Sequence, residues 1–265
     1  MELQRILLLN RKKTVLTSIR ANSGHLNITA QAHTPLNRAS KVEIKRQLES
    51  CLRLGEDFTE FHSESRRHSQ YRWVAAVGAG RLLRAPTLFE DMVKMICTTN
   101  CTWALTTLMT TNLVEALGVQ FGSSLRAFPA PAAIAGCTEQ FMRSTIKSGY
   151  RSPYLIQFSE HVASGKLPVE SWRISNAPTP ELLRQVQSIK GVGPYAAANV
   201  LKLIGRYDYL GLDSWVRAKY YELHHRGRRV KDSTIENRYA KYGRWRGLFF
   251  WLEMTRHWHA GKFPS

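Results

Sequence analysis

The stretch "SIKGVGPYAAANVL", residues 188–201, decides the fold, because it predicts two helices joined by a tight hairpin. Ahead of it, "APTPELLRQVQSI" predicts a helix with Thr179 as the N-cap and Pro180 at the first helical position. Behind it, Pro194 begins a second helix, which ends at Gly205. The two glycines of the hairpin can adopt backbone angles that other residues avoid, and they let another backbone approach closely.

The hairpin itself, Gly191-Val192-Gly193, predicts a site for a phosphate group. Amide N–H groups in the hairpin and in the first turn of the next helix have no intrahelical partners, and the helix dipole adds positive potential. A plain corner between two helices is the alternative. The charge of the chain favours phosphate, because 38 Lys and Arg against 20 Asp and Glu give a net charge of +18. No basic amphipathic segment suggests a membrane anchor instead.

The rest of the chain predicts a mainly α fold with a small N-terminal antiparallel sheet. Near the N-terminus, "RILLL", "TVLTSIR" and "HLNITAQA" have the pattern of strands, and "ANSG" predicts a turn. We therefore assign residues 1–37 to a small β region and residues 38–265 to a helical core that contains the hairpin, 188–194. In "APTLFEDMVKMICTTN", Thr87 and Glu90 form the pattern of a capping box ahead of an apolar helix face.

Nothing in the sequence predicts export, a membrane span or a metal centre. The longest apolar cluster, "GLFFWL" at 247–252, is too short to span a bilayer, and the N-terminus has no small-residue cleavage site. The spacing of Cys51, Cys97, Cys101 and Cys137 fits neither a redox pair nor an iron–sulfur cluster, so we expect buried thiols. We expect an intracellular monomer, in the cytoplasm or nucleus, with no redox cofactor and no zinc.

Asp213, in "YLGLDSWVRAKY", follows Tyr195 by eighteen residues. An isolated Asp here would serve as the N-cap of the next helix. A carboxylate at this distance behind a G-V-G hairpin, however, resembles the helix-hairpin-helix (HhH-GPD) DNA glycosylase superfamily. The segments "GRLLRAPTLFEDMVKMICTTNCTWALTTLMTTNLVEALG" (80–118) and "IKSGYRSPYLIQFSEHV" (146–162) are similar to parts of its 8-oxoguanine and alkylpurine (3-methyladenine) branches. The resemblance covers residues 80–258 and implies a two-lobed helical fold that binds double-stranded DNA.

The resemblance implies a monofunctional DNA glycosylase of base excision repair. Such an enzyme flips a damaged or modified base, here an alkylated or oxidised purine, and hydrolyses its N-glycosidic bond to leave an abasic site. Asp213 would stabilise the positive charge that builds on the sugar and would orient the water. Bifunctional members carry a Schiff-base lysine at the position of Tyr195, and a tyrosine cannot form an imine. Lys190 and Lys202 are interpreted as phosphate contacts or solvated side chains, not as nucleophiles.

The resemblance also implies which residues contact DNA. By motif position, the wedge that fills the hole left by the flipped base consists of Asn100, Tyr150 and Arg151. A helix C-cap at Asn100 and a helix-entry turn at 150–151 are the structural alternatives. The full set assigned to DNA binding is Gly191, Val192, Gly193, Lys190, Asn100, Tyr150, Arg151 and Arg217. One monovalent cation, Na+ or K+, is implied at the backbone carbonyls of Gln187, Ile189 and Val192.

The base pocket is assigned by register to Trp215, Gly247 and Trp251. Two departures weaken a standard 8-oxoguanine assignment. Leu105 stands in place of an arginine that reads an opposite cytosine, and the S-G-Q-x-F-x-W motif of that branch is absent. An aromatic pocket of Trp215, Trp245 and Trp251 would favour an electron-poor alkylated purine, with ordinary core packing as the alternative.

Two other functions are compatible with these motifs. The first is a non-catalytic helix-hairpin-helix module that binds DNA, for which Asp213 would be dispensable. The second is a bifunctional glycosylase and AP lyase that uses another lysine, which borohydride would trap on DNA. Every one of these functions predicts that DNA affinity falls with salt, so salt dependence does not separate them.

Overall fold

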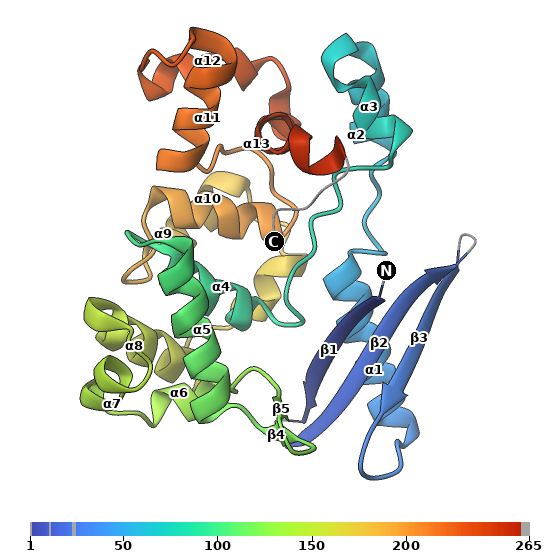
Figure 1. Ribbon diagram of the computed structural model, residues 1–265, viewed down its shortest axis with the longest axis vertical. Helices are drawn as coiled ribbons and strands as arrows, with labels where there is room; N and C mark the ends of the chain where they lie inside the picture. Colours follow the sequence, from blue (N-terminus) through green and yellow to red (C-terminus); the bar gives the residue numbers. More distant parts are fainter. Residues whose placement is uncertain (1, 11, 23–24, 261–265) are drawn as a thin grey trace. The chain divides into compact units, whose positions relative to one another are not determined.

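The computed structural model describes residues 2–10, 12–22 and 25–260 (Figure 1). Within these residues the chain is mainly helical and has a small N-terminal antiparallel sheet, which confirms the predicted fold class. In that described part, no helix combines the length and the apolar character that a membrane crossing requires.

The chain divides into two compact units. The sheet unit comprises residues 1–51 and 85–171, and the hairpin unit comprises residues 52–84 and 172–265. Each unit is therefore assembled from two separate stretches of sequence. The predicted domain boundary, between residues 37 and 38, falls inside the sheet unit. The predicted division into a β region and a helical core stays a prediction.

The sheet unit begins with three antiparallel strands in the order β1-β2-β3. Their bounds are β1 Glu2–Leu9, β2 Lys13–Asn22 and β3 His25–Gln31. Helix α1 (Arg38–Leu52) lies along the sheet, where Gln47 donates a hydrogen bond of 3.3 Å to the Leu8 carbonyl (Figure 1). The predicted turn "ANSG" includes residues 23 and 24, which lie outside the described residues.

Helix α4 packs against α5 and α8, and its predicted apolar face is confirmed. Phe89 of this face stacks on Phe158 of α8 with ring centroids 5.5 Å apart, and the apolar positions of the face are all buried: Leu88, Phe89, Met92, Val93 and Ile96. The elements are α4 Leu88–Thr98, α5 Trp103–Leu117, β4 Gln120–Phe121, β5 Leu125–Arg126, α6 Pro131–Ala135, α7 Glu139–Ser144, η2 Gly149–Arg151 and α8 Ser152–Ala163.

Half of the predicted capping box is present at the start of α4. The Thr87 hydroxyl accepts a hydrogen bond of 3.2 Å from the Glu90 amide. The Glu90 side chain does not return to Thr87, because it is buried and binds the cations of Arg5 and Lys94 instead. A buried carboxylate without a cationic partner would cost several kcal/mol. Glu90 therefore forms ion pairs with Arg5 and Lys94 and does not complete the capping box.

The hairpin unit is built from short helices around an aromatic core. The largest fully buried side chains of that core are Phe61, Tyr71, Tyr220, Tyr239, Phe249 and Phe250. The elements are α2 Thr59–Arg67, η1 Ser69–Tyr71, α3 Arg72–Ala76, α9 Thr179–Gln187, α10 Pro194–Leu203, α11 Ser214–His225, α12 Asp232–Ala240, η4 Gly243–Trp245, α13 Arg246–Met254 and η5 Arg256–Ala260; η3 Val169–Ile174 begins in the sheet unit and ends in the hairpin unit.

The predicted start of α9 is wrong by one residue. Pro178 occupies the N-cap position and Thr179 is the first helical residue. The Thr179 hydroxyl is used elsewhere, because it donates a hydrogen bond of 3.1 Å to the carboxylate of Asp208. The helix is therefore fixed to the loop after α10 rather than capped by its own threonine.

Candidate active site and nucleic-acid interface

The hairpin between α9 and α10 has the predicted tight form. Gly191 has φ +87°, in the left-handed region that favours glycine, and the Val192 amide donates to the Ile189 carbonyl at 3.0 Å. Gly193 has an ordinary φ of −84°, so the unusual angle is found at Gly191 only. A Cβ at Gly193 would meet no atom within 4 Å, which leaves the N-terminus of α10 open to an approaching group. Lys190 is exposed beside it.

Asp213 is the N-cap of α11, which confirms its predicted structural role. Its Oδ1 accepts a hydrogen bond of 2.8 Å from the Val216 amide, and the residue is half-buried. The loop before it is pressed against α10, since a Cβ at Gly211 would lie 2.5 Å from Nδ2 of Asn199. Tight packing two residues upstream fixes where the carboxylate lies. Its catalytic role stays a prediction.

Lys202 is buried, so its interpretation as a phosphate contact or a solvated side chain is wrong. The side chain is only 4% exposed, and its Nζ donates a hydrogen bond of 3.2 Å to Oδ1 of Asn199. Its ammonium lies 4.8 Å from the centroid of the Trp251 ring. Burial lowers the pKa of Lys202 to about 8, and the carboxylate of Asp213 opposes this shift. A charged amine thus shares the interior of the hairpin unit with the candidate catalytic carboxylate.

A tryptophan cluster lies beside Lys202, but its members differ from those predicted. The rings of Trp215 and Trp251 have centroids 6.5 Å apart, and Trp258 lies 5.8 Å from each of them. Trp245 instead packs in the core, stacked on Tyr207 at 5.4 Å. The core-packing alternative therefore holds for Trp245, and the sequence reasoning missed Trp258.

Gly247 has a packing role that explains why a glycine stands there. Its amide donates a hydrogen bond of 2.7 Å to the Tyr207 carbonyl. A Cβ on Gly247 would lie 2.3 Å from the Tyr209 carbonyl oxygen, so no other residue permits this close approach of α13 to the loop. Its assignment to the base pocket stays a prediction.

The three predicted wedge residues come together in the sheet unit. Asn100 follows the C-cap of α4 with φ +47°, as in the C-cap alternative, and its Nδ2 lies 3.4 Å from the Tyr150 hydroxyl. The Arg151 guanidinium lies 4.5 Å from the Tyr150 ring centroid and donates to the Thr99 carbonyl. Arg151 is only 3% exposed, whereas Asn100 and Tyr150 are exposed. Arg151 thus holds the end of α4 in place, and the other two face outward.

Two further residues modify the predicted interface. Trp103, in the first turn of α5, is 79% exposed and follows Asn100 by three residues, a position that the motif comparison did not single out. An aromatic residue directly behind "CTTNCT" was the signal available in the sequence. Arg217, assigned to DNA binding, makes two hydrogen bonds of 2.8 Å to the carboxylate of Asp232. Its contact with DNA stays a prediction.

Other sites that carry chemistry are few. Among residues 2–10, 12–22 and 25–260, no cluster of three or more His, Cys, Asp and Glu side chains has the arrangement of a metal site. The four cysteines all lie in that part and form no disulfide; Cys51 and Cys97 are buried as expected, and Cys101 and Cys137 are half-buried. Burial raises the pKa of the Cys97 thiol to about 12, which makes it unreactive.

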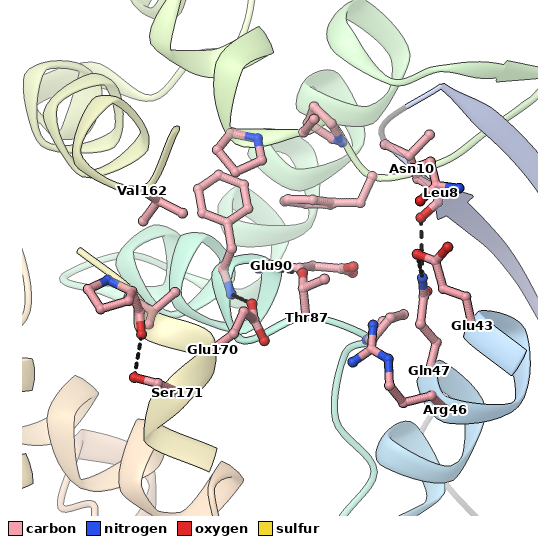
Figure 2. A pocket seen from close by; sticks show the side chains of 18 of the residues that line it. Leu8, Asn10, Glu43, Arg46, Gln47, Thr87, Glu90, Val162, Glu170 and Ser171 are labelled. Carbon is pink, nitrogen blue, oxygen red and sulfur yellow. Dashed lines mark hydrogen bonds between the residues drawn. The ribbon is translucent and has the colours of Figure 1, made fainter. Parts of the chain in front are cut away.

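A cavity of about 450 Å³ lies within the sheet unit, apart from all the predicted site residues. Figure 2 shows Glu43 and Gln47 of α1 on one side of it and Glu170 on the other. These groups are already engaged, since Gln47 donates to Glu43 at 3.1 Å and the Phe89 amide donates to Glu170 at 3.0 Å. No residue assigned to the chemistry lines this cavity.

The structure resembles solved structures of DNA glycosylases. An 8-oxoguanine glycosylase/lyase from Clostridium acetobutylicum, in complex with double-stranded DNA, is 19% identical, with a TM-score of 0.70 over 95% of this chain and 88% of that one. The 3-methyladenine DNA glycosylase from Archaeoglobus fulgidus is 17% identical, with a TM-score of 0.75 over 97% and 88%. That of Schizosaccharomyces pombe, in complex with abasic DNA, is 19% identical, with a TM-score of 0.57 over 76% and 97%.

Sequence comparison adds nothing to this likeness. No family profile matches the chain, and neither does any curated protein sequence. At identities below 20% in these three structures, the likeness shows the fold, and the chemistry has to be argued from the residues.

Proposed function

Since the chain has the fold of the helix-hairpin-helix DNA glycosylases, we propose that it is a monofunctional DNA glycosylase of base excision repair. It would act as a monomer on double-stranded DNA, flip a damaged or modified purine and hydrolyse the N-glycosidic bond. The observation that carries the proposal is Asp213, which caps α11 within the same unit as the G-V-G hairpin.

Asp213 would act on the charge that develops at the sugar. As the N-glycosidic bond breaks, positive charge builds on the sugar ring, and a nearby carboxylate stabilises it electrostatically. Oδ1 of Asp213 accepts from the Val216 amide, which fixes the orientation of the carboxyl group. Oδ2 would then face the sugar and the attacking water.

Water would be the nucleophile because the position of the Schiff-base lysine in bifunctional glycosylases is occupied by a tyrosine here. Tyr195 stands two residues after Gly193 and cannot form an imine. Lys202 is the nearby buried amine, but it is only 4% exposed and its Nζ is engaged with Oδ1 of Asn199, so we assign it no attack on the sugar. The product would be an intact strand with an abasic site.

Each unit has its own residues that would contact DNA. In the hairpin unit, the open N-terminus of α10 and the exposed Lys190 suit a phosphate group. In the sheet unit, Asn100 and Tyr150 would enter the space that the flipped base leaves. A carbonyl oxygen has two lone pairs, so the Ile189 carbonyl that accepts from Val192 can also ligate Na+ or K+. The carbonyls of Gln187, Ile189 and Val192 would hold that ion.

The proposal is tested with Asp213→Asn on duplexes that carry 8-oxoguanine, hypoxanthine, 1,N6-ethenoadenine, uracil or an alkylated purine. Asparagine is also a good N-cap, so the helix is kept while the charge is lost. We expect the wild type to release one class of base and the variant to lose at least about 10²-fold in rate, as when one electrostatic group is removed from an active site.

Asp57→Asn is the matched control. Asp57 also accepts a hydrogen bond of 2.8 Å from an amide at a helix start, that of Thr59, so the same substitution is made beside a helix N-terminus without chemistry. This variant should keep the wild-type rate. Base release that survives in Asp213→Asn would contradict the catalytic role of Asp213, whereas DNA binding without release of any base would favour the non-catalytic module.

The products distinguish a monofunctional enzyme from a lyase. Each reaction is divided and developed with and without hot alkali, and a parallel sample contains borohydride. Strand breaks only after alkali, with no protein trapped on DNA, are expected for hydrolysis by water. Breaks without alkali, or a borohydride-trapped complex, would show an amine nucleophile and contradict the argument from Tyr195.

A further inference from the structure

Lys202 is a buried charge that the proposed chemistry does not use. The backbone on which it stands is fixed, because the Arg53 guanidinium donates to the Lys202 carbonyl at 3.2 Å. Its side chain is held by Asn199, whose own amide donates to the Tyr195 carbonyl at 2.9 Å. An ammonium held this rigidly in the interior has a strong local field, because water and salt do not screen it as they do at the surface.

The field of Lys202 acts on the place assigned to the base. Its Nζ lies 4.8 Å from the centroid of the Trp251 ring. A flipped base that stacks on Trp251 would lie either against the ammonium or on the opposite face, with one ring between them. In both arrangements the base experiences a positive charge. The indole of Trp251 attracts cations, but the ammonium of Lys202 already makes this cation–π interaction.

From these contacts we infer that Lys202 is a specificity-determining residue, which disfavours cationic N-alkylated bases and favours uncharged or anionic bases with carbonyl oxygens. The inference rests on the proposed glycosylase function and refines its substrate class. It corrects the expectation that an aromatic pocket alone would select an electron-poor alkylated purine.

Base chemistry separates the two classes. A purine alkylated at N3 or N7 carries a formal positive charge in DNA, and like charges in contact cost several kcal/mol. Oxidised and deaminated bases, such as 8-oxoguanine and hypoxanthine, are uncharged at neutral pH and present carbonyl oxygens that accept from an ammonium. The carboxylate of Asp213 acts on Lys202 to raise its pKa, and it thereby favours the charged form of the lysine.

The test compares single-turnover rates on two duplex substrates, one with 8-oxoguanine or hypoxanthine and one with N7-methylguanine. The enzymes are the wild type, Lys202→Met, Lys202→Arg and Lys202→Gln, with the Asp213→Asn rate subtracted as background. Lys241→Met is the matched control, because Lys241 is an exposed lysine of the same unit. Thermal unfolding of each variant reports whether it is folded, and the glutamine variant replaces the methionine variant if the latter does not fold.

We expect the wild type to prefer the uncharged base and Lys202→Met to shift the ratio of the two rates by at least about tenfold towards the cationic base. Lys202→Arg should keep the direction of the wild-type preference, and Lys241→Met should keep the ratio. A wild type that prefers N7-methylguanine, or a Lys202→Met variant that changes both rates by the same factor, would overturn the inference and leave the glycosylase proposal standing. Absence of base release by the wild type, or unchanged release by Asp213→Asn, would overturn both.

Discussion

Asp213 combines a structural and a proposed chemical role in one carboxylate. Oδ1 accepts from the Val216 amide and stabilises the start of α11, typically by about 1 kcal/mol. Substitution by alanine would remove both the cap and the charge, and a loss of activity would then have two explanations. Asparagine keeps the cap, so only the asparagine variant isolates the charge.

Lys202 predicts a pH dependence of stability at the residue scale. Its pKa is about 8 in the folded protein and about 10.5 when exposed, so between these values the unfolded chain binds more protons and stability rises with pH. Below pH 8 the cost of burying the ammonium is fully present, on the order of 3 kcal/mol. Lys202→Met should therefore be more stable than the wild type at pH 7, and the difference should shrink as the pH approaches 10.5.

Urea unfolding of both proteins at several pH values between 7 and 10 measures this difference. Comparing the two proteins at each pH cancels the other groups that titrate in this range. A difference in the free energy of unfolding that is constant with pH would show that Lys202 is charged to the same extent in the folded and unfolded states.

The burial of Lys202 was partly readable in the sequence. The five other buried positions of α10 are Ala196, Ala197, Ala198, Val200 and Leu201, which cover just over half of the circumference of the helix. Lys202 stands next to this apolar face, so its position on the helix favours burial. Asn199 lies three positions earlier on the same helix, but the other partner, Trp251, required the tertiary structure, because α10 and α13 are separated by more than forty residues.

At the scale of elements, the contact between α10 and the loop before α11 positions the candidate site. A Cβ at Gly211 would lie 2.5 Å from the Asn199 amide, whose oxygen accepts from Lys202. Gly211→Ala should displace this loop, and Asp213 with it. Because a misplacement of about 1 Å can cost about 10²-fold in rate, we expect base release to fall by about 10- to 100-fold.

Gly55→Ala is the control for this substitution. Gly55 belongs to the same unit, and a Cβ there would meet no atom within 4 Å. The rate of base release and the melting temperature are measured for both variants. Equal rates for Gly211→Ala and the wild type would mean that Asn199 rotates away without moving the loop.

Local sequence patterns predicted caps and turns correctly where residues close in sequence determine the structure. The caps at Thr87 and Asp213 and the hairpin at Gly191 all depend on residues within a few positions, and all three are confirmed. The predictions failed where distant residues compete. Glu90 binds Arg5, 85 positions away, instead of closing its capping box, and Thr179 binds Asp208 instead of capping α9.

At the scale of the whole molecule, the net charge of +18 predicts DNA affinity that depends strongly on salt. Each phosphate neutralised by a lysine or arginine releases counterions, so affinity should fall by at least about tenfold between about 50 and 200 mM KCl. Lys190→Gln should reduce the slope of log K against log salt by about 1, because Lys190 would contact one phosphate. Titration of labelled duplex by fluorescence anisotropy measures both values.

Lys241→Gln is the matched control for this slope, since Lys241 is equally exposed but lies outside the hairpin. Its slope should equal that of the wild type. An unchanged slope in Lys190→Gln would exclude a phosphate contact at Lys190 and direct the search to other cations of the hairpin unit.

The fold itself was predictable although identity to the solved structures is low. Three short motifs in the order of the glycosylase fold, at 80–118, 146–162 and 188–213, were sufficient. The division into two units was not predictable, because each unit joins two stretches that are distant in sequence. Contacts such as the Arg5–Glu90 ion pair produce that division, and periodicity within a single stretch does not reveal them.

The distribution of the seven tryptophans gives the protein an optical reporter of its own. Trp103 is the only one in the sheet unit and is 79% exposed, while the other six belong to the hairpin unit. An indole in water emits at longer wavelengths than a buried one, so a difference spectrum between the wild type and Trp103→Phe isolates the fluorescence of one indole. That signal comes from a position three residues behind Asn100, and it can follow events there in real time without an attached dye.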